Sequence, residues 1–165
     1  IPLVANIFTP LVVIIQVVFL TVMLVSGKSP FNDREFLMLI NVLLAVVTVL
    51  VVFSITGTAS EKKQSYTPVV LLLLTAVTLI TNVVALSAII YRLGEFGLTP
   101  NRTAVLGVNL LIFVHLALMA IDLFRTVFGK RELKRVERTT ALYLPVYALW
   151  TIIVVFLFPW IFATS

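Results

Sequence analysis

The sequence contains no cysteine and little charge. The lack of cysteine excludes disulfides, thiolate chemistry and cysteine-ligated metals. Charged residues make up 12% of the 165 residues, whereas soluble domains contain about 25%. Hydrophobic residues make up 61%, and the mean hydropathy is +1.18. These values exclude a water-soluble domain, so we expect the chain to lie in a lipid bilayer.

Motifs for the common enzyme chemistries are also missing from the sequence. It has no GxSxG nucleophile elbow, no HExxH zinc motif and no phosphate-binding P-loop. A single histidine with no second carboxylate nearby offers too few ligands for zinc or iron, so we expect neither a metal nor a cofactor. The net charge of +5 does not indicate nucleic-acid binding, because the main basic segment lacks interleaved aromatic residues.

Five hydrophobic runs are each long enough, at about 20 residues, to cross a hydrocarbon core of about 30 Å as a helix. The sequence therefore predicts an all-α integral membrane bundle of five transmembrane helices in a single domain. The chain begins at Ile1 rather than at a methionine, so we expect it to belong to a longer protein. The predicted spans are residues 7–25, 36–55, 68–91, 100–124 and 141–162.

Three of these helices follow capping signals. Asn32 is expected to cap the second helix, with Glu35 as its capping-box partner three residues later. Thr67 and Thr99 each precede a proline, a pattern that is typical of helix starts.

The third span carries polar and small residues at spacings of three and four, which place them on one helix face. Lipid offers such residues no hydrogen-bond partner, so we expect this face to contact other helices. The face contains Thr75, Thr78, Asn82, Ala85, Ile89 and Arg92.

The fourth span has two polar rows. Arg102 and Asn109 lie seven residues apart on one face, and His115 and Asp122 lie seven apart on another, about 120° away. We expect this helix to be central and to have neighbours on two sides. His115 and Asp122 could form a proton relay, but the sequence favours a structural role. In that role His115 bonds a Thr, Asn or Gln of a neighbouring helix, and Asp122 pairs with Arg125.

Charge, glycine and proline crowd together in YRLGEFGLTPNRT, residues 91–103, between the third and fourth spans. Two interpretations stay open. Arg92 and Glu95 pair and form a structural latch, or Arg92, Glu95 and Arg102 form a binding site for an anion or a lipid headgroup at the start of the fourth helix. The latch is favoured.

The loop after the fourth span is strongly basic, and we expect it to contact anionic lipid headgroups from the cytoplasm. Leu133 and Val136 give it an apolar edge, which suggests a short helix on the membrane surface. This distribution of charge predicts a cytoplasmic N-terminus and a C-terminus outside. The basic residues of the loop are Lys130, Arg131, Lys134, Arg135 and Arg138.

Residues 91–103, and less closely SGKSPFNDREFL at residues 26–37, resemble a family of bacterial multi-pass inner-membrane proteins classified as a domain of unknown function. A tyrosine-arginine pair, a glycine before Leu-Thr and an arginine three residues after the threonine carry the resemblance. It implies that the chain is the C-terminal portion of a longer protein, and it implies no activity. The motif positions are Tyr91, Arg92, Glu95, Gly97, Thr99 and Arg102.

We expect a non-enzymatic scaffold, sensor or assembly component of the bacterial inner membrane, in contact with lipids and with a membrane-protein partner or a second copy of the chain. The alternative is a transporter or channel subunit with a polar path along the third and fourth helices. A lipid-modifying enzyme is the third hypothesis. Transport predicts that the polar face of the third span lines a hydrated cavity, whereas a scaffold predicts that helices fill it. An enzyme predicts a cleft in which at least two of Arg92, Glu95, Arg102 and His115 reach one molecule.

Overall fold

The computed structural model describes residues 2–27, 29–59, 67–129 and 132–163. This part of the chain contains no strand, and five of its helical stretches are long and apolar enough to cross a membrane. The protein is thus an all-α integral membrane protein, as the sequence predicts. Its elements are α1 (Pro2–Val25), α2 (Arg34–Ala59), α3 (Thr67–Phe96), α4 (Pro100–Gly129), α5 (Lys134–Ile152), the π-helical η1 (Ile153–Leu157) and α6 (Phe158–Ile161).

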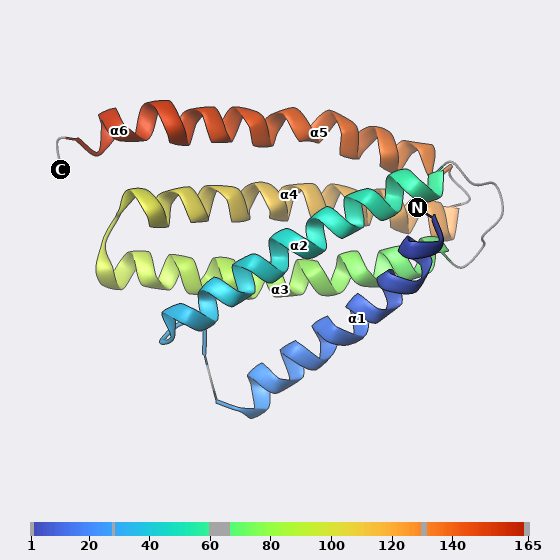
Figure 1. Ribbon diagram of the computed structural model, residues 1–165, viewed down its shortest axis with the longest axis horizontal. Coiled ribbons are helices and arrows are strands. Elements are labelled where there is room, and N and C mark those ends of the chain that lie inside the picture. The colour runs from blue at the N-terminus through green and yellow to red at the C-terminus, as the bar shows by residue number, and fades with distance from the viewer. Residues whose placement is uncertain (1, 28, 60–66, 130–131, 164–165) are drawn as a thin grey trace.

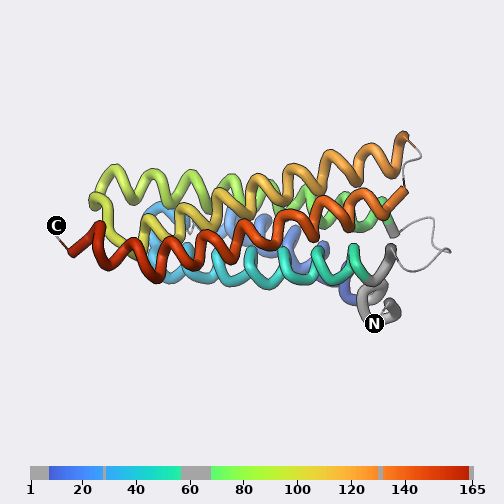
Figure 2. Tube along the Cα trace, turned by 90° about the horizontal axis from the view of Figure 1, so that it is seen from above, coloured from blue at the N-terminus to red at the C-terminus, as the bar shows by residue number. Residues whose placement is uncertain are grey.

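The helices form an antiparallel bundle built around α3 and α4 (Figure 1). These two lie side by side and are joined by residues 97–99. The continuous rod of α5, η1 and α6 runs along α4. Helix α2 crosses α3 and α4 diagonally, and α1 packs on α2 and α3. Figure 2 shows the same bundle turned by 90°. We call the end of the bundle at residues 97–99 the turn end, and the opposite end, where α5 begins, the loop end.

Several helix boundaries differ from the predicted ones. The cap of α2 is Asp33 rather than Asn32, because the Asp33 Oδ1 accepts the amide N–H groups of Glu35 at 2.9 Å and of Phe36 at 3.3 Å. α3 runs past its apolar segment to Phe96 and ends before Gly97, whose φ is 76°. Hydrophobic runs mark only the part of a helix inside the membrane core. The helix itself continues beyond that core until a capping residue or a glycine ends it.

The predicted surface helix at Leu133 and Val136 is not a separate element. Lys134 begins α5, which continues as one rod through the membrane span, and Val136 is fully buried. Pro145 consequently lies well inside α5. The wider π turn of η1 lies just before Pro159, where it leaves room for a ring that would otherwise collide with the preceding turn.

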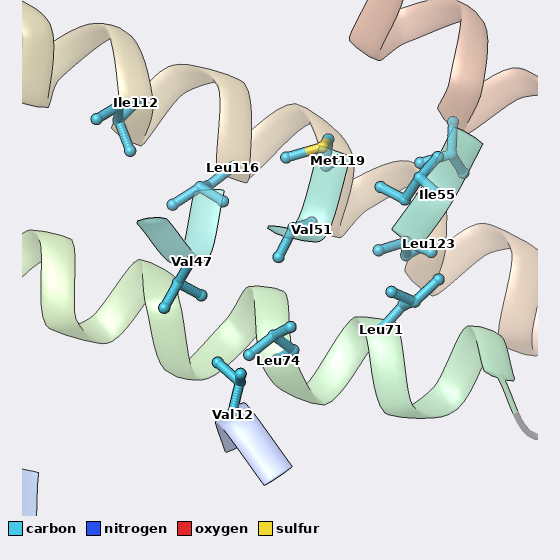
Figure 3. Close-up of a cluster of buried hydrophobic side chains, with 11 residues drawn as sticks. Val12, Val47, Val51, Ile55, Leu71, Leu74, Ile112, Leu116, Met119 and Leu123 are labelled. Carbon is cyan, nitrogen blue, oxygen red and sulfur yellow. The ribbon is translucent and has the colours of Figure 1, made fainter. Parts of the chain in front are cut away.

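A cluster of buried apolar side chains joins α2, α3 and α4, with one further residue from each of α1 and α5 (Figure 3). Val47 and Val51 of α2 lie between Leu74 of α3 and Leu116 of α4. Lipid tails are as apolar as these side chains, so the cluster stabilises the bundle by close packing rather than by removal from water. Its buried members are Val12, Val47, Val51, Ile55, Leu71, Leu74, Ile112, Leu116, Met119, Leu123 and Val136.

Glycine at position 107 allows α5 to approach α4. A Cβ atom at Gly107 would collide with the ring of Trp150, and the Trp150 Nε1 donates a hydrogen bond to the carbonyl oxygen of Ala104 at 3.4 Å. We expect Gly107→Ala to displace the Trp150 ring and to lower the free energy of unfolding by about 2 kcal/mol, as overpacking does. Reversible unfolding of the protein in detergent micelles measures this change.

Gly94→Ala is the matched control, because nothing lies within 4 Å of a Cβ atom at Gly94, which is also helical. It should stabilise α3 slightly. Equal stabilities of the Gly107 and Gly94 variants would contradict the proposed role of the Gly107 contact.

Candidate functional site

The polar face of α3 is packed against other helices. The Thr78 hydroxyl lies 3.1 Å from the Gln16 Oε1 of α1 and 2.6 Å from the carbonyl oxygen of Leu74 in its own helix. The Asn82 Nδ2 lies 3.2 Å from the carbonyl oxygen of Asn109 and 3.5 Å from its Oδ1. Thr75 is fully buried and bonds the carbonyl oxygen of Leu71 within its own helix. The prediction that this face contacts neighbouring helices is confirmed.

The two polar rows of α4 also meet different neighbours, as predicted. Asn109 and Arg102 face α3, through Asn82 and the last carbonyl groups of that helix. His115 and Asp122 face α5. The centre of the bundle is nonetheless shared, because α3 contacts α1, α2 and α4.

Asp122 is held by two residues of α5. Its Oδ2 accepts a hydrogen bond from Thr139 at 2.7 Å, and its Oδ1 lies 3.3 Å from the Arg135 Nε. The Asp122 side chain is 9% exposed and that of Arg135 is 56% exposed, so the pair lies at the edge of the bundle. The predicted pairing with Arg125 is wrong, because the first turns of α5 bring Arg135 to the carboxylate.

His115 lies between two tyrosines of α5. Its Nδ1 is 3.0 Å from the Tyr147 hydroxyl, and its ring stacks on Tyr143 with centroids 4.5 Å apart. The Tyr143 hydroxyl donates to the carbonyl oxygen of Leu111 at 3.0 Å. The expected Thr, Asn or Gln partner is thus a tyrosine, and no hydrogen bond within the described ranges joins His115 to Asp122. One sequence signal could have indicated this cluster, namely the four-residue spacing of the two tyrosines.

The turn between α3 and α4 is held by Arg102. Its Nη1 donates to the carbonyl oxygens of Phe96 at 2.8 Å and Gly97 at 3.0 Å, while the Thr99 hydroxyl accepts the Arg102 amide at 3.3 Å. Thr99 therefore caps α4, as the sequence predicts. Arg102 satisfies carbonyl groups that the end of α3 leaves without partners.

The expected ion pair between Arg92 and Glu95 does not form. Among the described residues the one salt bridge is that of Asp122 and Arg135. The Arg92 Nη1 instead lies 3.5 Å from the carbonyl oxygen of Phe31, and its guanidinium lies over the Phe96 ring, 5.5 Å from the centroid. The Arg102 guanidinium lies over the same ring at 5.4 Å.

A groove of about 760 Å³ opens between α2 and the turn end of the α3–α4 pair. Three arginines line it: Arg92 and Arg102, as the anion-site interpretation expects, and Arg34, which the sequence reasoning missed. Glu95 is exposed and is not among the lining residues. Other lining residues are Leu37, Met38, Asn41, Val42, Ala45, Ile89, Phe96, Thr99, Asn101 and Val105.

The basic segment at the loop end is described in part. Lys130 and Arg131 lie outside the described residues, whereas Lys134, Arg135 and Arg138 belong to the first turns of α5 and are exposed. They lie at the opposite end of the bundle from the groove.

The chain matches no family model, no curated protein and no solved structure. The resemblance of residues 91–103 to a bacterial inner-membrane family consequently stays a prediction.

We expect Tyr147→Phe to lower the free energy of unfolding by about 1 kcal/mol. The change removes the partner of the His115 Nδ1, and the His115 Nε2 is already enclosed without a partner. Tyr91→Phe is the control, since the Tyr91 side chain is 46% exposed and its hydroxyl makes no hydrogen bond in the described chain. Equal unfolding midpoints for the two variants in detergent would show that the His115 contact contributes nothing to stability.

Proposed function

We propose that this integral membrane protein is a non-enzymatic membrane component that holds an anionic lipid in the groove between α2 and the α3–α4 turn. The observation that carries the proposal is a set of three arginines beside an apolar wall of the groove. None of these arginines has an acidic partner in the part of the chain that the structure describes. Phosphate is the group that such arginines bind best, because a guanidinium offers paired N–H donors as well as charge.

The lining of the groove contains three positive charges and no negative one, although acidic residues lie at the same end of the bundle. Asp33, Glu35 and Glu95 are all near the turn end, yet none lines the groove and none forms a salt bridge. The Asp33 carboxylate is used to cap α2. An anion from the membrane would therefore be the partner of Arg34, Arg92 and Arg102.

The shape of the groove suits a lipid better than a free anion. The arginines come from the ends of α2, α3 and α4, and the residues farther from those ends, such as Val42 and Ala45, are apolar. A headgroup at the arginines would leave its acyl chains against this apolar wall. The volume of about 760 Å³ lies within the usual range for small-molecule sites, about 300–1,000 Å³.

The same geometry favours binding over transport or catalysis. The polar face of α3 is filled by Gln16, Asn109 and neighbouring side chains, which is the arrangement that a scaffold predicts. Two of the four residues expected in an enzyme cleft, Arg92 and Arg102, do line one groove, but its lining contains no carboxylate and no histidine for acid–base chemistry.

The charge distribution supports an orientation. Exposed basic residues at the loop end, among them Lys134 and Arg138, would contact anionic headgroups on the cytoplasmic side of a bacterial inner membrane. The turn end and its lipid groove would then face outward. A second copy of the chain or another membrane protein would be the partner of such a scaffold.

Replacing Arg34 tests the proposal. The Arg34 side chain makes no hydrogen bond or ion pair with the described residues, so Arg34→Gln should leave the fold intact, unlike changes at Arg102. We expect it to lower the affinity for phosphatidic acid about ten-fold, the effect of one charge-assisted contact. Native mass spectrometry of the full chain in detergent measures retained phosphatidic acid against phosphatidylcholine with the same acyl chains.

Arg125→Gln is the matched control, because it removes the same charge from an exposed side chain at the loop end that has no partner in the described chain. Wild type and the Arg125 variant should retain equal amounts of phosphatidic acid. The proposal fails if both variants lose lipid equally, or if wild type does not prefer phosphatidic acid over phosphatidylcholine.

A further inference from the structure

One polar side chain lies among the apolar residues of the groove. Asn41 of α2 lines it, together with Met38, Val42 and Ala45 of the same helix. Asn41 makes no hydrogen bond within the described chain. Its Oδ1 is enclosed by protein without a partner, whereas its Nδ2 is not enclosed. The Asn41 amide therefore presents a free N–H donor on the groove side.

Other buried polar groups in the bundle differ from Asn41 in this respect. Gln16, Asn82 and His115 each leave one atom without a partner, but a second atom of each side chain bonds a neighbouring helix. The Thr48 hydroxyl also lacks a partner, and it is enclosed. The bonded atoms of Gln16, Asn82 and His115 join helices, whereas the Asn41 side chain makes no hydrogen bond in the part of the chain that the structure describes.

The position of Asn41 along α2 matches one part of a lipid. It follows Arg34 by seven residues, which places it on nearly the same face and about 10 Å farther from the turn end. Val42 and Ala45 follow it toward the membrane centre. Asn41 thus lies between the level of the arginines and the apolar wall, where a phospholipid has its glycerol backbone and acyl linkages.

We propose that Asn41 donates a hydrogen bond from its Nδ2 to an acyl carbonyl oxygen of the anionic lipid bound in the groove. This inference rests on the proposed function, and it names the ligand class as acyl-linked phospholipid. An ester linkage supplies this carbonyl oxygen, whereas a dialkyl ether lipid has no carbonyl oxygen at that position to accept the bond. The groove therefore distinguishes two lipids that carry the same phosphate and chains of the same length.

The test compares diacyl phosphatidic acid with its dialkyl ether analogue, matched in chain length, in competition for the full chain in detergent. Native mass spectrometry gives the ratio of the two lipids retained. We expect wild type to prefer the diacyl lipid about five-fold, which corresponds to about 1 kcal/mol for one hydrogen bond. In Asn41→Leu the ratio should fall to about one, while both lipids still bind through the arginines.

Asn41→Ala guards against a steric effect of leucine in the groove and should give the same ratio of about one. Because a ratio is measured in each sample, a general loss of folded protein cancels. Arg34→Gln should weaken both lipids and keep the preference, since it leaves Asn41 in place.

The outcomes separate this inference from the proposal on which it rests. If wild type retains the two anionic lipids equally, and both above phosphatidylcholine, the role of Asn41 is overturned and the anionic groove stands. If the preference persists in both Asn41 variants, Asn41 is not the group that distinguishes the ester linkage from the ether linkage. If neither lipid is retained above phosphatidylcholine, the groove itself is not an anionic lipid site, and both proposals fall.

Discussion

A bilayer interior supplies no hydrogen-bond partner, so a polar side chain within a span is stabilised when it bonds another helix or the backbone of its own helix. This constraint acts most strongly on α4, where Asn109 is met by Asn82 of α3 and His115 by Tyr147 of α5. Each such bond is worth only about 0.6 kcal/mol on average in a membrane. Their main effect is to fix which helix lies on which side of α4 and how it is rotated, because apolar surfaces alone would tolerate sliding.

The fold and the two-sided character of α4 could be predicted because their signals are local. Hydrophobic runs and seven-residue spacings need no knowledge of other helices. The partners could not be predicted. Tyr143 and Tyr147 are indistinguishable in sequence from an aromatic belt, and Asp122 has a nearby candidate in Arg125. Its observed partner Arg135 is chosen by the rotation of α5, which no local pattern records.

Only the part of the candidate site that lies close to the α3–α4 turn in sequence could be predicted. Arg92 and Arg102 stand out beside a turn with glycine and proline, but Arg34 and Asn41 of α2 lie more than 50 residues earlier in the chain. They reach the groove because α2 crosses the α3–α4 pair diagonally (Figure 1). That crossing follows from aliphatic packing around Val47 and its neighbours, and an almost uniformly apolar helix does not reveal which face it will bury.

The α3–α4 turn is closed by Arg102 and not by the predicted Arg92–Glu95 latch, and this closure is compatible with the proposed anion site. Arg102 uses one nitrogen to bond two carbonyl oxygens at the end of α3, which satisfies those acceptors but does not neutralise its charge. The guanidinium groups of Arg92 and Arg102 lie over one Phe96 ring, whose electron-rich face offsets their mutual repulsion only in part. A phosphate near both would turn that repulsion into attraction, since it would meet the N–H donors of Arg102 that the turn leaves unused. Arg102 therefore both closes the turn and lines the proposed lipid groove, and its bonds to the two carbonyl oxygens fix the position of its charge.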